Sequence, residues 1–291
     1  MSFPEEHHYL PQFLLAPWCG EDGMLTAFSK PYQDKVVARR YAPSAVAKRA
    51  NLYTYIGMPE GKAQVLETVF FQKVDHEGAL ALQAAFANGA NTITRDQRAQ
   101  LAVFLMSLRV RHPDAIAMIR KEGAEGLVAA LDRDPEEAVA AGLAPVQRLS
   151  ELVHQDNPAL IENFGLSILP EIATNPNYLN RLARLDWVDV QFPAAAPELV
   201  ISDRALLLRG DLLTECVMVL PVGPRRAMLI NSDRRHIDAF RQLPPKEQVR
   251  SINKWSVEEA VEYVYARGVE HLPLVKRRLR RRPDRGRREL E

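Results

Sequence analysis

The sequence predicts an α+β fold, in which a helical middle packs on a mainly antiparallel sheet. In residues 62–184 apolar side chains recur at spacings of three and four, which is the period of amphipathic helices. In residues 185–231 the chain changes to five short β-prone runs separated by Pro, Gly and Asp turns, as in antiparallel sheets. We therefore expect residues 1–268 to form a single domain, followed by a basic, disordered tail over 269–291.

Short strands are expected before the helical middle, in residues 24–28 and 51–55, and they could join the main sheet. A basic stretch, residues 35–40, lies between them. Helical spacing then covers residues 62–88 and is interrupted near Gly78, which predicts two consecutive helices.

The clearest helix signal begins at a capping box. Thr94 is followed three positions later by Gln97, a pair whose side chains can each accept a hydrogen bond from the other's backbone N–H. An apolar stripe over residues 101–108 follows, and Pro113 limits the helix at its far end.

The remaining elements follow from breakers and caps. Residues 114–154 contain several Gly and Pro breakers and are expected to form short helices, and Pro158 opens a further apolar helix. Helical spacing returns over residues 235–268, with a cap at Ser256. The expected buried side of that helix comprises Ala260, Val261, Val264 and Tyr265. The five expected strands are residues 187–192, 198–201, 205–208, 216–220 and 227–230.

Composition is that of an ordinary globular chain, with 291 residues, 47% of them hydrophobic and 26% charged. No apolar run approaches the roughly 20 residues of a spanning helix, and residues 1–6 are polar and acidic, unlike a signal peptide. The two cysteines, Cys19 and Cys216, lie far apart and lack metal-ligand spacing. We expect a cytoplasmic protein with reduced cysteines.

Charge is distributed unevenly along the chain. The net charge is +1, but residues 276–291 contain nine Lys or Arg and three acidic residues, so they carry +6 and the rest carries −5. A basic arm of this kind can contact phosphate backbones, while the alternative is a passive, solubilising end. The residues expected to contact nucleic acid are Lys276, Arg277, Arg278, Arg280, Arg281 and Arg282.

The opening segment, residues 7–15, places His7 and His8 among aromatic and aliphatic residues. Imidazole titrates near neutral pH and is the commonest metal ligand. Asp203, with Ser202 before it, follows an apolar strand and could supply the anionic oxygen of a divalent-metal or acid–base site. Neighbouring strand residues point to opposite faces, so at most one histidine could ligate the ion, and we take His8 with Asp203. In the structural alternative the histidines bind carbonyls and Ser202–Asp203 caps a turn.

Other charged residues could extend such a site. Glu67, Asp75 and Glu77 could complete a carboxylate cluster for Mg²⁺ or Mn²⁺, although such residues usually form a solvated helix face. Arg109 and Arg111 end the capped helix and could bind phosphate, or they could simply complement the helix dipole.

An aromatic–basic patch is a further candidate for nucleic-acid contact. Tyr53 and Tyr55 beside Lys48 and Arg49 could stack a base, while packing in a strand is the alternative. The sequence lacks a GxxxxGK[ST] loop, a GxGxxG after a strand, HExxH, GxSxG and CxxC, which lowers the nucleotide-binding, zinc-protease, esterase and thioredoxin-like interpretations.

The opening block, His-His-Tyr-Leu-Pro-Gln-Phe at residues 7–13, resembles the start of the bacterial domain-of-unknown-function family numbered 4238. Later blocks resemble that family in the same order, at residues 52–53, 111–113, 201–204, 220–224 and 260–266. The resemblance covers about residues 7–266. It implies kinship, and no activity, cofactor or mechanism comes with it.

Two functions follow from the residues. The first is a metal-assisted hydrolase of phosphodiesters, similar to a nuclease, which predicts a bound divalent metal. Its catalytic residues would be His7, His8, Ser202 and Asp203, and its substrate-binding residues Gln12, Arg111 and Arg204. The second is a non-catalytic binding or regulatory protein with a structural histidine block, which predicts that His8→Ala lowers stability and nothing else.

Overall fold

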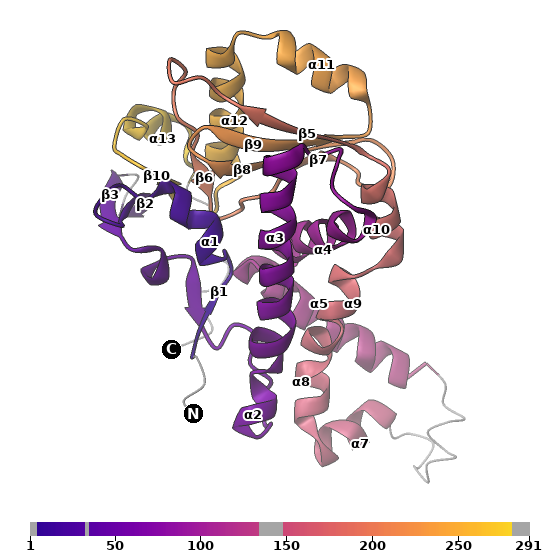
Figure 1. The fold of residues 1–291 in the computed structure, drawn as a ribbon. Helices are drawn as coiled ribbons and strands as arrows, with labels where there is room; N and C mark the ends of the chain where they lie inside the picture. Colours follow the sequence, from indigo (N-terminus) through magenta and orange to yellow (C-terminus); the bar gives the residue numbers. More distant parts are fainter. Residues whose placement is uncertain (1–4, 33–34, 134–147, 281–291) are drawn as a thin grey trace.

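The computed structural model describes residues 5–32, 35–133 and 148–280, and it confirms the α+β fold class. Within these residues the strands form three sheets, all of them antiparallel, beside a helical middle (Figure 1). None of the described helices is long and apolar enough to cross a membrane.

The central sheet is buried on both faces. Its strand order is β5 (Asp186–Gln191), β9 (Arg226–Asn231), β8 (Cys216–Gly223) and β7 (Leu207–Gly210). Because strand side chains alternate, Met218 and Leu220 pack with the helical middle, while Val219 and Leu229 pack with α12 (Pro245–Glu259) on the other face.

A second, N-terminal sheet corrects the expectation that the early strands join the main one. Its order is β3 (Lys35–Tyr41), β2 (Leu25–Tyr32), β10 (Val264–Ala266) and β6 (Ile201–Ser202). The run expected as a strand over residues 198–201 contributes only β6, and it belongs to this sheet because it pairs with β10.

The smallest sheet pairs β1 (Glu6–His8) with β4 (Lys48–Ala50), with His7 opposite Arg49. The strand expected over residues 51–55 is wrong, because the chain turns as soon as β4 ends. Asn51 has a φ of 53°, a left-handed conformation that asparagine tolerates and that interrupts a strand.

The helices of the middle begin at the expected caps. Gln97 N–H donates to Thr94 Oγ1 at 3.1 Å and Thr94 N–H donates to Gln97 Oε1 at 2.9 Å, which confirms the capping box. Pro158 opens its helix as expected. The middle comprises α2 (Glu60–Ala63), the π-helix η3 (Leu66–Phe71), α3 (Gln72–Asn88), α4 (Arg95–Val110), α5 (Pro113–Leu131), α7 (Leu149–Asp156), α8 (Pro158–Ser167), α9 (Leu169–Ala173) and α10 (Pro176–Ala183). Outside it lie α1 (Gln12–Leu15), the 3₁₀ turns η1 (Ala16–Trp18) and η2 (Pro43–Ala45), α11 (Arg234–Gln242), α12 and α13 (Leu272–Arg278).

The helix break expected near Gly78 is wrong. Helix α3 runs through Gly78, and the interruption lies earlier, at Gln64, between α2 and η3. A Cβ at Gly78 would lie 2.6 Å from Phe104 Cγ, so the glycine allows α4 to approach α3 closely.

The C-terminal part differs from expectation in two places. Helix α12 begins at Pro245 and contains Ser256 in its last turn; it ends at Glu259, and Val264 and Tyr265 form strand β10 instead of a helix face. The tail expected to be disordered from residue 269 contains α13, which is held by the buried side chains of Val275 and Leu279. Residues 281–291 lie outside the described residues.

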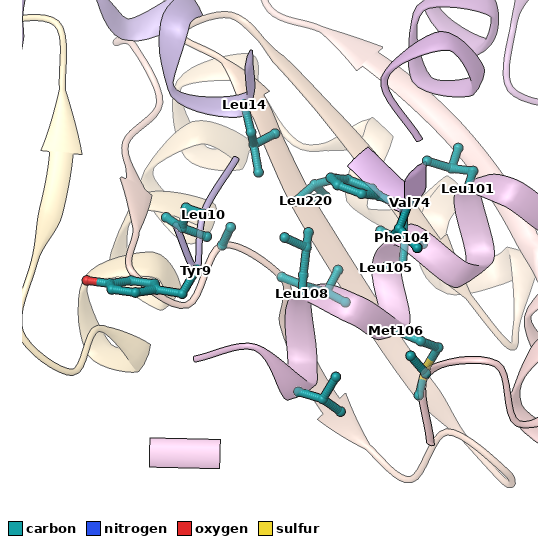
Figure 2. Packing of buried hydrophobic residues seen from close by; sticks show 14 of the residues in the cluster. Tyr9, Leu10, Leu14, Val74, Leu101, Phe104, Leu105, Met106, Leu108 and Leu220 are labelled. Carbon is teal, nitrogen blue, oxygen red and sulfur yellow. The ribbon is translucent and has the colours of Figure 1, made fainter. Parts of the chain in front are cut away.

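The opening segment enters the hydrophobic core between the helical middle and the central sheet. Figure 2 shows Leu10 and Leu14 beside Leu108 of α4 and Leu220 of β8. Leu10 and Leu14 are each 1% exposed. The segment is therefore built into the core, and the histidines before it are fixed in position.

Candidate functional site

His7 is fully buried and accepts a backbone hydrogen bond. Its Nδ1 accepts from the N–H of Tyr53 at 3.0 Å, and the two rings stack with centroids 5.4 Å apart and an interplanar angle of 6°. The imidazole thus links β1 to the turn that follows β4. The nitrogen that accepts this bond is neutral and is occupied by the protein.

Arg111 is the centre of this region, at the C-cap of α4. Its Nη1 and Nη2 donate to the two carboxylate oxygens of Asp75 at 2.5 and 3.1 Å, and Nη2 also donates to the carbonyl of His8 at 3.3 Å. The guanidinium lies 4.4 Å from the ring centroid of Phe71, and the Tyr53 hydroxyl donates to the Arg111 carbonyl at 2.7 Å. We call His7, Tyr53, Phe71, Asp75 and Arg111 the Arg111 cluster.

The charge of Arg111 is compensated inside the protein. The side chain is 1% exposed, and the bidentate bond to Asp75 raises the pKa of Arg111 despite burial. In this arrangement both terminal nitrogens of the guanidinium donate to acceptors of the protein. Phosphate binding by Arg111 would require the Asp75 pair to open.

Glu67 lies next to this cluster on the π-helix η3, a form that often occurs at functional sites. Burial raises the pKa of Glu67 to about 7, although the positive charge of Arg111 opposes the shift. Among the described residues no hydrogen-bond donor reaches Glu67 Oε2. Glu67 can therefore exchange a proton near neutral pH.

Glu67→Gln is expected to change how stability depends on pH. The folded pKa of about 7 lies above the ordinary 4.5, so the fold favours the protonated form, and wild-type stability falls as pH rises from 4.5 through 7. At pH 8 the glutamine variant should gain about 1 to 2 kcal/mol relative to wild type, after allowance for solvent screening, and at pH 5 much less. Chemical denaturation at both pH values measures this. Equal effects at pH 5 and pH 8 would contradict it, and Glu171→Gln, at an exposed carboxylate of α9, is the control.

Asp203 is also buried and holds a turn of the backbone. Its carboxylate accepts N–H bonds from Val261 at 2.8 Å, Glu262 at 2.6 Å and Tyr263 at 2.8 Å. Burial raises the pKa of Asp203 to about 6, against the lowering effect of these three bonds. Ser202 Oγ donates to the Arg204 carbonyl at 2.9 Å, so this pair of residues stabilises the end of β6.

Tyr9 joins the two groups of buried polar residues. Its ring packs edge-on against His112 with centroids 5.3 Å apart, and burial raises its pKa, with a further contribution from the negative charge of Asp203. His112 follows Arg111 directly in sequence, and Tyr9 follows His8. The blocks at residues 7–13, 52–53, 111–113, 201–204 and 260–266 therefore meet in one continuous buried region.

The other expected site residues are more exposed. His8 is half-buried, and burial lowers its pKa; among the described residues its Nε2 has no hydrogen-bond partner. Gln12 is exposed at the start of α1. Arg204 lies 3.4 Å from Asp114, where it forms an ion pair at the surface.

The residues proposed as metal ligands do not fit a metal site. Among the described residues no group of three or more His, Cys, Asp or Glu is placed to hold an ion. Both Asp203 oxygens accept backbone N–H bonds, Asp75 is paired with Arg111, and Glu77 lies 3.9 Å from Lys73. The carboxylates of Asp203, Asp75 and Glu77 are therefore engaged within the fold, whereas His8 Nε2 and Glu67 Oε2 have no hydrogen-bond partner among the described residues.

Two hollows lie away from this region. One, of about 330 Å³, is lined by residues of α5, α7 and α8, among them Ser150 and His154. The other, of about 220 Å³, lies between β5 and α12 and includes Gln191 and Gln248. Neither is lined by a residue that the sequence proposed for catalysis.

The basic tail residues divide into three groups. Lys276 and Arg277 are exposed on α13 and Arg280 is exposed two residues after its end, while Arg278 pairs with Glu258 at 3.0 Å. Arg281 and Arg282 lie outside the described residues.

Helix α13 packs on strand β3, where Val36 shares a hydrophobic cluster with Val275 and Leu279. Strand β3 contributes the exposed side chains of Lys35 and Arg39. We call Lys35, Arg39, Lys276, Arg277 and Arg280 the basic edge; none of the five forms an ion pair with a described residue. The sequence showed both basic segments but not that they are neighbours.

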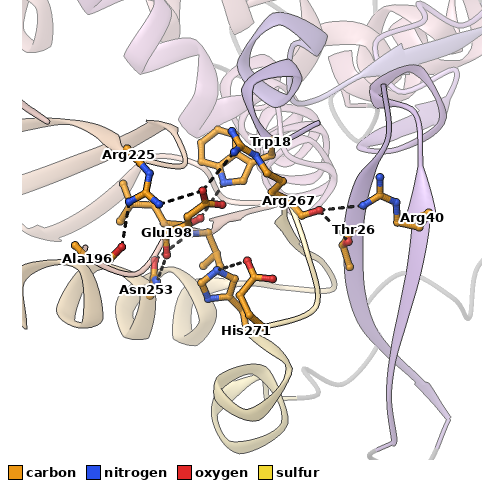
Figure 3. Close-up of polar contacts among 12 residues, drawn as sticks. Trp18, Thr26, Arg40, Ala196, Glu198, Arg225, Asn253, Arg267 and His271 are labelled. Carbon is orange, nitrogen blue, oxygen red and sulfur yellow. Dashed lines mark hydrogen bonds and ion pairs between the residues drawn. The ribbon is translucent and has the colours of Figure 1, made fainter. Parts of the chain in front are cut away.

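A second polar group connects the two four-stranded sheets (Figure 3). Glu198 lies 3.5 Å from Arg225 and 3.4 Å from Arg267, and its carbonyl accepts from Asn253 at 2.8 Å. The Arg267 carbonyl in turn accepts from Arg40 at 3.0 Å. Sequence reasoning missed this group, because it joins five residues that lie far apart in the sequence and form no local motif.

Comparison with known families identifies the kinship of the chain. A family model described as a protein of unknown function (DUF4238) matches residues 6–268. The search of curated proteins and the search of solved structures each found no match. The family match begins within β1 and ends after β10, so it includes every block of the buried region described above. The chain therefore belongs to the DUF4238 family.

Proposed function

We propose that this protein binds nucleic acid and does not itself catalyse a reaction. The observation that supports this is the basic edge, whose five exposed cationic side chains come from two contacting parts of the chain. Lys35 and Arg39 lie on the face of β3 that points away from α13, and Lys276, Arg277 and Arg280 lie on α13 and just after its end. Neither element contains an acidic residue. Phosphate backbones are the polyanions that such a surface attracts without a dedicated pocket.

The buried residues favour binding over hydrolysis. His7 and Arg111 are occupied by Tyr53 and Asp75, and Asp203 is occupied by three backbone N–H groups. A nuclease-like mechanism would need these groups to face a substrate. Their contacts within the protein support a role as a buried framework for the N-terminal segment.

Removal of three cations from α13 and the segment just after it is expected to weaken nucleic-acid binding. In Lys276→Ala/Arg277→Ala/Arg280→Ala, the affinity for an oligonucleotide at about 0.1 M salt should fall at least tenfold, because three phosphate contacts are lost. The slope of log Kd against log salt should decrease by about 2 for a single strand or about 3 for a duplex. Fluorescence anisotropy over a salt series measures both quantities.

A matched variant separates this surface from net charge alone. Lys62→Ala/Lys73→Ala/Lys121→Ala removes the same charge from exposed positions of the helical middle. It should leave the affinity within about twofold and the slope nearly unchanged. Equal losses in both variants, or no binding by the wild type, would overturn the proposal.

The metal-assisted hydrolase would replace this proposal if metal analysis gave stoichiometric Mn²⁺ or Zn²⁺ that was lost in both His8→Ala and Asp203→Ala. We further propose a location in the bacterial cytoplasm, where nucleic acid is available and both free cysteines would stay reduced.

A further inference from the structure

Tyr32 is an exposed aromatic residue at the border of the basic edge. It ends strand β2, and its side chain is 70% exposed, more than any other large hydrophobic side chain among the described residues. Burial explains most other tyrosines of this chain; Tyr53 and Tyr265, for example, are 0% exposed. No packing requirement accounts for an aromatic ring at position 32.

The strand register places Tyr32 on the same face as two cations. Tyr32 lies opposite Lys35 in the β2–β3 pair. Side chains alternate along a strand, so Lys35 and Arg39 share one face of β3, while Val36 and Ala38 face the cluster that contains α13. The register of the β2–β3 pair shifts between Ser29 and Tyr32, so the face of Tyr32 follows from its partner and not from alternation along β2. Directly opposite residues point to the same side of a sheet, so the Tyr32 ring lies on the face of Lys35 and Arg39.

The spacing of these three residues fits an extended chain of phosphates and bases. Lys35 and Arg39 are four residues apart, or about 13 Å along the strand. The aromatic ring lies beside one end of this pair of charges. A flat aromatic side chain next to cations on a sheet face is the arrangement with which proteins bind single strands, because every base offers a face for stacking.

We propose that the β3 part of the basic edge binds single-stranded nucleic acid, with one base stacked on Tyr32 and the neighbouring phosphates on Lys35 and Arg39; this rests on the proposed function. A duplex satisfies the same cations but keeps its bases stacked on each other, so it cannot use Tyr32. The ring therefore gives preference for single strands, and the cations give affinity.

This assignment replaces the aromatic–basic patch expected around Tyr53 and Tyr55. Tyr53 is buried between His7 and Phe71, with ring centroids 5.4 and 4.5 Å away, so no base can reach it. Tyr55 is half-buried and packs against the main core.

The test compares a labelled single strand of about 15 nucleotides with its duplex, using the full chain and fluorescence anisotropy. Tyr32→Ala should weaken binding of the single strand roughly 5- to 100-fold, since one base loses its stacking partner, and should leave duplex binding within about twofold. Tyr32→Phe keeps the ring and should bind as the wild type does. Leu80→Ala, at a 53% exposed position on α3, is the control for loss of an exposed apolar side chain.

Each outcome decides between the proposals. If single strand and duplex bind equally and Tyr32→Ala changes neither, the basic edge binds phosphates without stacking; the single-strand assignment then fails while nucleic-acid binding stands. If Tyr32→Ala weakens both equally, the ring does not select single strands and the assignment again fails. If the wild type binds neither oligonucleotide but binds vesicles containing anionic lipid, or binds none of the three, both proposals fail.

Discussion

Arg111→Met is expected to lower the free energy of unfolding by about 3 to 5 kcal/mol, the largest effect we anticipate for a single substitution. The change removes the partner of Asp75, the bond to the His8 carbonyl and the contact with the Phe71 ring at once. It leaves a carboxylate that is 24% exposed without its counter-charge, beside Glu67. Denaturation by urea, followed by tryptophan fluorescence, measures the loss.

Two further variants show which part of Arg111 matters. Arg111→Lys keeps the charge but not the bidentate geometry, so it should fall between wild type and Arg111→Met. Arg111→Met/Asp75→Leu removes both charges and should be more stable than Arg111→Met alone, because no unpaired carboxylate remains. A loss below about 1 kcal/mol in Arg111→Met would contradict the structural role and would return Arg111 to the list of phosphate-binding candidates.

Asp203→Ala is expected to cost about 3 kcal/mol or more, because three buried N–H groups lose their acceptor together. These groups belong to the segment that leads into β10, so the loss should also loosen the N-terminal sheet. Asp203→Asn keeps one acceptor oxygen and should cost about half as much. Denaturant midpoints measure the global effect, and amide hydrogen exchange at Val264 and Tyr265 measures the local one.

The Ser202→Ala change tests whether Asp203, and not its neighbour, is the main acceptor that stabilises this turn. Ser202 Oγ makes a single bond, to the Arg204 carbonyl, so its removal should cost only about 1 kcal/mol. Equal losses for Ser202→Ala and Asp203→Ala would contradict the assignment of Asp203 as the main acceptor for this turn.

Local signals predicted the helical middle well. The capping box at Thr94 and the proline at 158 mark helix starts through chemistry that neighbouring residues supply, and both are found where expected. The β-prone runs of the central sheet were recognisable because they are short apolar runs separated by Pro, Gly and Asp turns. The opening histidine block was also recognisable as special, since two imidazoles in an apolar segment require partners.

Long-range contacts explain the failures. Val264 and Tyr265 continue the helical spacing of Ala260 and Val261, yet the N–H groups of Val261, Glu262 and Tyr263 donate to Asp203 and cannot join a helix. No sequence signal near residue 260 predicts that these N–H groups will bond to Asp203. Helix α13 was not predicted for another reason. Its basic composition suggested a disordered tail, and the i, i+4 apolar pair Val275 and Leu279 was overlooked.

The sequence named residues for the candidate site and left two roles open for them, one catalytic and one structural. In the structure Arg111 donates to the His8 carbonyl, Tyr9 packs against His112, and Asp203 lies near enough to Tyr9 for its charge to raise the pKa of that tyrosine. Their partners, Tyr53, Asp75 and the backbone of 261–263, come from elements that no local pattern connects to them. Burial and pairing, which decide whether such groups act on a substrate, are properties of the assembled fold.

The position of β10 has a consequence for biosynthesis. This strand lies between β2 and β6, so the sheet that starts at residue 25 is completed only by residue 266. At the usual rate of translation, β10 is synthesised on the order of 10 to 50 seconds after β2. One edge of β2 lacks its hydrogen-bonding partner strand for that time. During that interval the nascent chain offers an open strand edge, and protection by a chaperone would matter more for this protein than for one whose sheets form from adjacent segments.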